Sequence, residues 1–389
     1  MITSFQIPDE TKALLKQPGG ACGKNDLIYD GTGESFIDLS MGHGSVFMGH
    51  ANQEIASHVH RQVDSLWTRS EISLEIVHKA AQAAEKLLTK DYKLAQFYST
   101  GMEAVETALR IAQVTTQKTR VGGLQESAHG KSFAAIGLGW ENRFNKNNIF
   151  FRLPFPSGDK SEKSLAVLDK ELKAGNIAAV VVEPVLCSKS GKLLSPDFFR
   201  ELSMRCRRHG CFLIVDEVIT GCYRTGPAFL SVELGFEPDI LIAGKALGNG
   251  FPVSAVFLNK KHSSNPEMYL NSTYSNNPLA AAAVYGTLSE MKKLNFNEIA
   301  LRVETVLKEE LAGMEKFGIY LEGKGCLWIL EFPENYPVEK LTAELFKNGV
   351  LLSATSSIIR LLPPATILPD NLRKACRLIK NTASRHTPA

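Results

Sequence analysis

The sequence predicts an α/β protein with a large domain built on a mostly parallel sheet and a smaller α+β domain at its C-terminal end. The first observation is the length of 389 residues, which exceeds one minimal hydrophobic core. The second is a pair of short, apolar, β-branched runs, Ile177–Val182 and 211–215, separated by a helical segment that starts at Ser195. A strand, a crossover helix and another strand form a parallel pair. The third is a change of pattern near Asn295, after which helices and strands follow in an αββαβα order.

We therefore expect three segments: residues 1–45, an N-terminal segment that packs with the small domain; residues 46–290, the large domain; and residues 291–389, the small domain. Up to about Gly33 the sequence is typical of an arm with an early helix and then a glycine-rich turn. A short strand follows at residues 35–40. The glycine-punctuated loop after it contains His43 and His50. Since neither has an evident carboxylate partner, we interpret both as loop residues.

Capping and stop signals delimit the helices of the large domain. Ser99 and Thr100 can cap a helix whose buried face carries Val105, Ala108, Leu109 and Ala112. The helix that starts at Ser195 has a proline at its first position, an acid in its first turn and arginines in its last turn. Further elements are expected as follows: a helix over residues 73–88, strands at 240–243 and 253–258, a helix from Pro278, helices at 298–316, 338–347 and 371–384, and strands at 319–322, 327–332 and up to Leu362.

Composition excludes several classes of function. A net charge of +3 in a chain of this length gives no reason to expect a nucleic-acid partner or an acidic membrane surface. No apolar run approaches the roughly 20 residues of a membrane span, and the N-terminal residues do not resemble a signal peptide. The seven cysteines are scattered without metal-ligand spacing, so we expect no metal site and reduced thiols in a cytoplasmic protein.

The most informative stretch joins two predicted strands to charged residues. The strand at 211–215 ends on Asp216 and Glu217, and the strand at 240–243 is followed by Lys245 between two glycines. In open α/β sheets, ligands bind beyond the carboxyl ends of the strands. A structural ion pair would give the same pattern. The other interpretation is a pyridoxal phosphate site, in which a lysine forms a Schiff base with the cofactor and a carboxylate pairs with its ring nitrogen.

The flanking residues favour the cofactor site. The segments IVDEVITGCYRTG and PDILIAGKALGNGFPVSAV resemble, in order and in spacing, the core of the class III aminotransferases, which are fold-type-I pyridoxal phosphate enzymes. The resemblance extends from about Phe36 to Leu378. It implies that Lys245 carries the cofactor and moves a proton between substrate and cofactor. It also implies that Asp216 stabilises the protonated ring nitrogen, and that residues 46–290 are the cofactor-binding domain.

The same resemblance implies further cofactor contacts. The turn STGMEA places Thr100, Gly101 and Met102 where the family binds the cofactor phosphate, at the start of a helix whose amide groups attract anions. His129, Glu183 and Val218 match the motifs "HG", "EP" and "DEV", with Val218 packing on the cofactor ring. Thr273 matches a threonine that binds the phosphate of the neighbouring subunit, which implies a homodimer with shared active sites.

Three positions depart from the family pattern. Ala128 replaces the aromatic residue that stacks on the ring, and Tyr98 and Trp140 are candidates to replace it. Met102 replaces a hydroxyl residue, and Ile219 replaces a glutamine that contacts the ring hydroxyl. The segment after Glu183 also contains no acid before Asp197, so the glutamate that masks an active-site arginine in some members is absent.

The resemblance also implies a small amino donor and a keto acid or aldehyde acceptor as substrates. Arg360, which precedes a double proline, matches the arginine that receives the substrate α-carboxylate. Lys131 occupies the place of an arginine for a second carboxylate. Transamination is the expected reaction. A glutamate-1-semialdehyde type of aminomutase, other pyridoxal phosphate chemistry and a non-catalytic cofactor-binding scaffold remain as alternatives.

Overall fold

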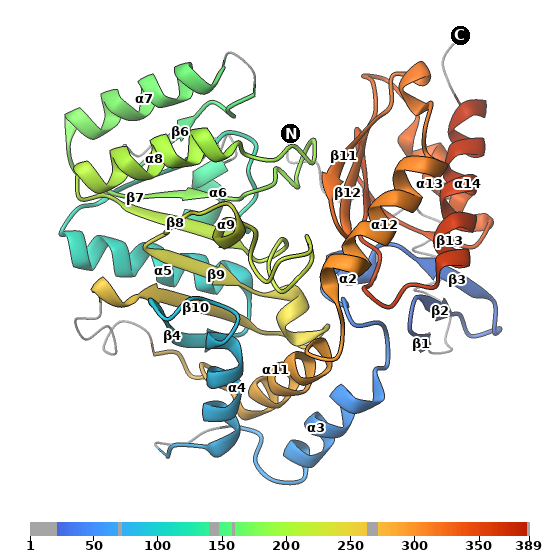
Figure 1. Ribbon diagram of the computed structural model, residues 1–389, viewed down its shortest axis with the longest axis horizontal. Helices are drawn as coiled ribbons and strands as arrows, with labels where there is room; N and C mark the ends of the chain where they lie inside the picture. Colours follow the sequence, from blue (N-terminus) through green and yellow to red (C-terminus); the bar gives the residue numbers. More distant parts are fainter. Residues whose placement is uncertain (1–21, 69–71, 140–147, 158–159, 263–270, 387–389) are drawn as a thin grey trace.

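The computed structural model describes residues 22–68, 72–139, 148–157, 160–262 and 271–386. Its large domain is organised around a seven-stranded sheet with the strand order β4-β10-β9-β8-β7-β5-β6 (Figure 1). The strands are β4 (Tyr92–Tyr98), β5 (Arg120–Leu124), β6 (Phe150–Leu153), β7 (Ile177–Val182), β8 (Phe212–Glu217), β9 (Ile240–Ala243) and β10 (Ser254–Asn259). Strands β5 to β9 pair in parallel, and β10 runs antiparallel to both of its neighbours. The predicted mostly parallel sheet is confirmed.

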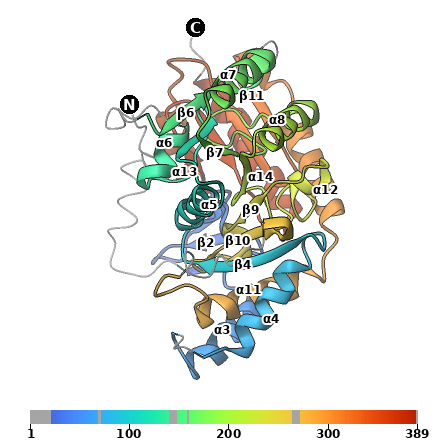
Figure 2. The same cartoon turned by 90° about the vertical axis from the view of Figure 1, so that its left-hand side faces the viewer.

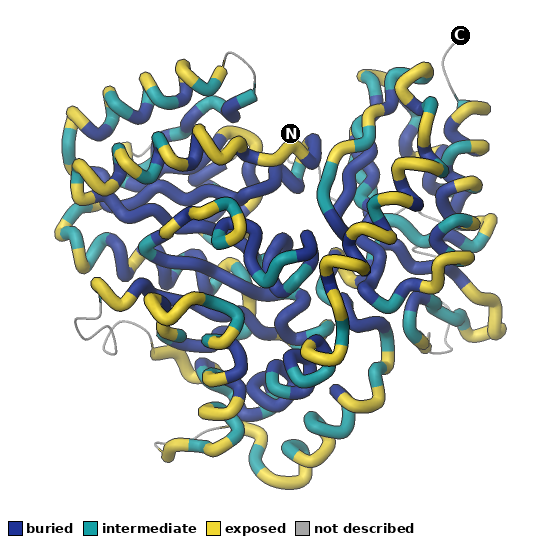
Figure 3. Tube along the Cα trace, in the orientation of Figure 1, coloured by how far each residue is buried: buried dark blue, intermediate teal, exposed yellow. Residues whose placement is uncertain are grey.

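Helices cover both faces of this sheet, which explains the continuous apolar runs of its strands. On one face lie α5 (Gly101–Thr116) and α6 (Phe133–Gly139), and on the other lie α7 (Lys160–Ala174) and α8 (Pro196–Arg208). The strands are the most continuously buried part of the chain (Figure 3). Helix α8 begins as predicted, because Ser195 Oγ accepts the amide N–H of Phe198 at 3.2 Å.

A second group of helices completes the large domain. Helices α3 (Gln53–Val63) and α4 (Glu75–Glu85) both pack against α11 (Pro278–Met291), at the bottom of the molecule in Figures 1 and 2. Short elements connect the strands: α9 (Leu230–Glu233), η1 (Lys245–Gly248) and η2 (Lys260–His262). Among the residues that the structure describes, no helix is long and apolar enough to cross a membrane.

The C-terminal region forms its own antiparallel sheet, with the order β11-β12-β15-β14. Its elements are α12 (Phe296–Glu310), η3 (Met314–Phe317), β11 (Tyr320–Lys324), β12 (Leu327–Glu331), α13 (Val338–Lys347), β13 (Val350–Leu351), β14 (Ser353–Ala354), β15 (Ile358–Leu361) and α14 (Pro369–Arg385). The helix predicted to reach residue 316 ends at Glu310. Gly313 adopts a left-handed φ of +87°, which breaks the helix before η3.

The N-terminal strands join this C-terminal region. Strands β1 (Cys22–Lys24), β2 (Leu27–Tyr29) and β3 (Ser35–Asp38) form a sheet that continues into β13, where Ile37 pairs with Val350 in parallel. The early helix expected before this sheet lies outside the described residues. His50 has a carboxylate partner, since its Nε2 lies 2.8 Å from Asp38 Oδ2. The expectation that this histidine lacks such a partner was therefore wrong.

Candidate active site

Four neighbouring parallel strands deliver the predicted site residues to one edge of the sheet. His129 follows β5, Glu183 follows β7, Asp216 lies at the end of β8, and Lys245 follows β9. Because the carboxyl ends of parallel strands meet at the same edge, residues far apart in the chain come together there.

Asp216 and His129 form a buried pair. His129 Nδ1 lies 2.8 Å from Asp216 Oδ2, and Asp216 Oδ1 accepts the amide N–H of Val218 at 3.0 Å. Burial opposes the charged form of His129, but the hydrogen bond and charge of Asp216 outweigh it and raise the pKa of His129. Within the described part of the chain, the buried Nε2 of His129 has no hydrogen-bond partner. The imidazole therefore orients the Asp216 carboxylate, whose remaining lone pairs are available to a ring N–H.

Glu183 lies beside this pair. Its Oε1 accepts the amide N–H of Ala128 at 3.3 Å, which ties the end of β7 to the segment that carries His129. Burial raises the pKa of Glu183 to about 7, so near neutral pH a substantial fraction of this carboxyl is protonated.

Lys245 occupies a strained and enclosed position. Its backbone φ is +45°, a left-handed conformation that few non-glycine residues adopt. Removal of water from around the amino group lowers the pKa of Lys245. A lower pKa increases the fraction of unprotonated amine, which is the form that attacks an aldehyde.

The N-terminus of α5 lies next to the turn that carries Lys245. A Cβ placed on Gly101 would be 3.1 Å from Val218 Cγ1, and one placed on Gly244 would be 3.2 Å from the same atom. Val218 therefore packs between the two glycines. Thr100 caps the helix by accepting the amide N–H of Glu103 at 3.2 Å, and its carbonyl accepts Ser254 Oγ at 2.8 Å.

These groups fit pyridoxal phosphate. The first-turn amides of α5 have no intrahelical acceptor and form an anion site for the phosphate. Gly130 packs against the same turn, since a Cβ on it would lie 2.5 Å from Met102 Cβ. Met102 is 41% exposed and brings a backbone amide but no hydroxyl to this site. Asp216 would supply the carboxylate for the ring nitrogen, and Lys245 would supply the amine for the aldehyde.

The departures from the family pattern have structural consequences. Ile219 packs in an apolar cluster with Cys187 and Leu362, so its side chain belongs to the core. The Tyr98 ring lines a different cavity, beside Thr107 and Arg110, and so does not replace the aromatic residue expected at Ala128. The other candidate, Trp140, lies outside the described residues. Ala128 itself is exposed.

The predicted substrate residues come from both domains. Arg360 on β15 donates from Nε to the carbonyl of Cys187 at 2.9 Å, which joins the C-terminal sheet to the segment after β7. Lys131 is exposed and follows His129 and Gly130. Thr273 is also exposed. Its neighbour Ser272 donates to Glu103 Oε1 at 2.9 Å, which places this segment beside the first turn of α5 in the same chain.

Sequence reasoning missed two residues that shape the site. Arg224 is fully buried and donates to the carbonyls of Gly44 at 2.5 Å and Pro363 at 3.0 Å. His43, which we interpreted as a loop residue, is exposed, and its Nδ1 lies 3.2 Å from Ser353 Oγ. The contacts of both residues join segments more than 100 residues apart, so no local pattern could have indicated them.

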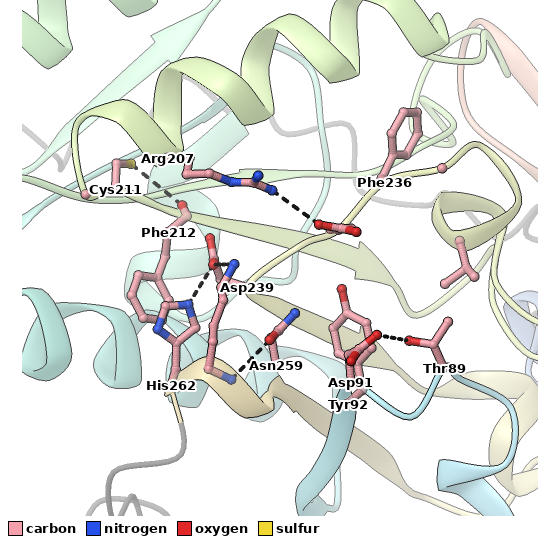
Figure 4. A pocket seen from close by; sticks show the side chains of 15 residues that line it. Thr89, Asp91, Tyr92, Arg207, Cys211, Phe212, Phe236, Asp239, Asn259 and His262 are labelled. Atoms are coloured by element: carbon pink, nitrogen blue, oxygen red, sulfur yellow. Dashed lines mark hydrogen bonds and ion pairs between the residues drawn. The ribbon is translucent and has the colours of Figure 1, made fainter.

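A cavity of about 720 Å³ at the opposite end of the strands is a different feature (Figure 4). It lies where β8 and β9 begin, beside Phe212 and Asp239. Its charged groups pair with one another. Asp239 Oδ1 binds Lys261 and His262, each at 2.7 Å, and Arg207 binds Glu237 at 3.3 Å. This cavity lacks an amine or carboxylate placed as Lys245 and Asp216 are.

Comparisons with known proteins agree with this geometry. An amine transaminase from an uncultivated Pseudomonas species, solved with its cofactor bound, superposes with a TM-score of 0.86 at 24% identity over 99% of this chain and 98% of that one. The ornithine aminotransferase of Toxoplasma gondii gives a TM-score of 0.83 at 24% identity, over 95% and 91% of the two chains. At these identities the structures show a shared fold.

The sequence relatives are more similar. The chain is 31% identical over 377 residues to an acetylornithine aminotransferase of Bacillus subtilis, with 94% of each chain covered. It is 30% identical over 363 residues to a [LysW]-aminoadipate semialdehyde/glutamate semialdehyde transaminase of Sulfurisphaera tokodaii, with 91% of each covered. The family model for class-III aminotransferases matches residues 21–383. The chain therefore belongs to the class-III aminotransferases, the enzymes that transfer amino groups with the help of pyridoxal phosphate.

Proposed function

We propose that this enzyme takes the amino group from an amino acid with an intact α-carboxylate and passes it to a keto acid or aldehyde, with Lys245 as the attachment point of the cofactor. The observation that carries this proposal is the link between Arg360 and the Cys187 carbonyl. It holds a guanidinium group of the small C-terminal sheet against the strand ends that carry Asp216 and Lys245. A carboxylate bound there by two parallel hydrogen bonds would present its Cα to one face of the site.

The roles of the other residues follow from their contacts. Bound pyridoxal phosphate supplies an electron sink for the pair that is released when the substrate Cα loses its proton. Lys245 carries that proton, and Asp216, oriented by His129, accepts the ring N–H. Thr100 and the amides of Gly101 and Met102 hold the phosphate.

The remaining contacts complete the assignment of the two domains. Val218 packs on the ring, and Glu183 holds the His129 segment through the amide of Ala128. Residues 46–290 then form the cofactor-binding domain. Residues 291–389, with residues 1–45 packed on them, form the domain that anchors the substrate.

Transamination is favoured over the alternatives. The two relatives at 30–31% identity are named an aminotransferase and a transaminase, and neither is named an aminomutase. A non-catalytic scaffold is not supported, because the family consists of enzymes and the chain carries both Lys245 and Asp216. The relatives' names suggest acetylornithine or an aminoadipate semialdehyde as types of substrate to test first.

Arg360→Ala should discriminate between substrate classes. We expect the rate of the first half-reaction with L-glutamate to fall about a hundredfold or more, because a charge-assisted pair in an enclosed site is lost. The rate with the decarboxylated analogue 4-aminobutyrate should change little, since it has no α-carboxylate. Stopped-flow absorbance of the cofactor measures both rates. Equal losses on both substrates would show that Arg360 is structural.

We further propose a homodimer with shared active sites. The supporting observation is a group of exposed apolar side chains around the first turns of α5, namely Met102, Phe133 and Tyr274, at 41%, 60% and 63% exposure. Exposed apolar groups gathered beside a site are typical of an interface. Thr273 adjoins this group and would reach the phosphate bound by the partner subunit.

Thr273→Ala should weaken cofactor retention without dissociating the dimer. The loss of one hydrogen bond to a charged group corresponds to about 1.5–3 kcal/mol. Equilibrium dialysis of the cofactor, with sedimentation of the same sample, measures both properties. Thr115→Ala, on the exposed side of α5, is the matched control and should retain the cofactor normally. An active monomer in sedimentation would refute the shared site.

A cytoplasmic location agrees with the cysteines. All seven are free thiols in the structure, as expected for a reducing compartment. The net charge of +3 likewise supports a small-molecule enzyme without a nucleic-acid or membrane partner.

A further inference from the structure

The turn α2 (Met41–Gly44) holds His43 in an unfavourable backbone conformation. The φ angles of Met41 and His43 are +46° and +55°, in the left-handed region that is unfavourable for a non-glycine residue. Two anchors hold the turn. Asp38 Oδ1 accepts the amide N–H of Met41 at 2.8 Å, and Arg224 donates to the carbonyl at the end of the turn at 2.5 Å. Strain that the surroundings maintain in this way is typical of functional sites.

The anchored turn places the His43 ring beside Arg360. His43 Nδ1 lies 3.2 Å from Ser353 Oγ, and Ser353 on β14 is the direct antiparallel partner of Arg360 on β15. Side chains of directly opposite residues stand on the same face of a sheet. The contact with Ser353 therefore fixes the ring on the face from which Arg360 projects.

Positive charges from several elements act on this imidazole. They belong to Arg360 on β15, Lys245 on η1 and Lys131 in the loop before α6. Among the described residues, the acid that acts on His43 is Asp38, and both of its oxygens are already engaged, by backbone amides and by His50. Although the residue is exposed, loss of water around the ring, followed by the charges of Arg360 and Lys245, lowers the pKa of His43. Its imidazole is therefore neutral at pH 7.

The positive charges of Arg360 and Lys131 match a ligand with two negative charges. No acid among the described residues forms an ion pair with Lys131. A ligand that satisfies both Arg360 and Lys131 must carry an anionic group at each end. Such a ligand neutralises the positive charges of Arg360 and Lys131, which oppose protonation of His43, so the bound complex favours the protonated ring more than the free enzyme does.

We propose that His43 takes up a proton when a dicarboxylate substrate binds, and that the resulting imidazolium secures the second carboxylate together with Lys131. The proposal rests on the proposed function, because it takes Arg360 as the site of the first carboxylate. His43 would thereby discriminate between amino acids with a second acidic group and those without one.

The coupling between proton uptake and ligand binding sets the direction in which dicarboxylate affinity changes with pH. Proton uptake on binding means that affinity for a dicarboxylate rises as the pH falls through the value at which His43 titrates in the complex, by at most about tenfold per pH unit. The gain levels off once the ring is also protonated in the free enzyme, which happens below its ordinary value of 6.5. A monocarboxylate should show no such dependence over the same range.

The test is calorimetric titration of the holoenzyme at pH 7.0 in several buffers of different ionisation enthalpy. Glutarate is the probe, and valerate, a monocarboxylate of the same length, is its control; neither carries an amino or keto group. We expect glutarate to be bound with net proton uptake and valerate without it. His43→Asn should abolish the proton uptake and weaken the binding of glutarate about tenfold, while valerate binding stays unchanged.

Asparagine is the matched substitution at this position. It tolerates the left-handed backbone, retains a polar group for Ser353 and does not titrate. His60→Asn on the exposed side of α3 is the control variant and should take up protons as the wild type does.

Two results would overturn the inference. One is undiminished proton uptake in His43→Asn. The other is an equal loss of glutarate and valerate in that variant, which would mean that His43 supports only the loop. The proposed function fails separately, if the wild-type holoenzyme shows no spectral change with any amino donor.

Discussion

Replacing Lys245 with alanine will reduce amino-group transfer by about 10⁴-fold, the upper range for loss of a general acid–base group. The loss is large because, in the proposed function, one side chain has two roles, covalent attachment of the cofactor and transfer of the substrate proton. Gly244 and the end of β9 place this amine beside Asp216, in surroundings that lower its pKa. The single-turnover rate with a saturating amino donor measures the effect.

The covalent role has its own measurement. Borohydride reduction of the wild-type holoenzyme, followed by peptide mapping, should place the cofactor on Lys245, and Lys245→Ala should give no labelled peptide. Lys163→Ala, an exposed lysine on α7, is the control and should be labelled as the wild type is. A label on any other lysine of the wild type would refute the assignment.

Much of this site was predictable because its residues follow directly from strand ends. Glu183 and Asp216 each come immediately after a short apolar run, and the crossover helix from Ser195 predicts that these two runs are parallel. Parallel pairing alone then places both side chains at one edge. The same logic predicts the cap at Thr100, because capping depends on residues only three positions apart.

Contacts between segments far apart in the chain were not predictable in the same way. Arg360 reaches a carbonyl 173 positions away, and His43 reaches a hydroxyl 310 positions away. Every residue also has a backbone carbonyl, so the sequence does not show which carbonyl will accept a hydrogen bond from a charged side chain. His50 shows the same limitation at short range, since its partner Asp38 lies only 12 positions earlier but on a separate element.

Arg224 is the clearest example of a residue whose contacts the sequence does not indicate. In the sequence it is one letter of the segment YRTG, with no acid to suggest a role. In the structure its guanidinium lies 4.1 Å from the centre of the Phe47 ring and is fully buried. Burial lowers the pKa of Arg224 to about 10, so the group stays charged at neutral pH. Its hydrogen bonds go to backbone carbonyls of three segments, at Gly44, Cys326 and Pro363.

This geometry makes Arg224 the link between α2, the C-terminal domain and the turn after β8. Removing a buried charge also removes the cost of its desolvation, which often makes an apolar replacement tolerable. Here the replacement would leave the buried carbonyls of Gly44 and Pro363 without a hydrogen-bond donor. Each unsatisfied buried carbonyl costs about 1–3 kcal/mol. Because these carbonyls converge from separate segments, no single backbone adjustment can satisfy both, and the loss should exceed the gain.

We therefore expect Arg224→Met to lower the free energy of unfolding by about 3 kcal/mol or more. It should also raise the KM for an amino acid donor, since α2 and the end of β15 lose their common anchor. Arg224→Lys keeps the charge but not the planar fork, and should lie between methionine and wild type. Urea unfolding measures the first effect and steady-state kinetics the second. Arg208→Met, at the exposed end of α8, should change stability by no more than about 0.5 kcal/mol. If Arg224→Met matched the Arg208 control in both stability and KM, the carbonyl contacts would have no energetic role.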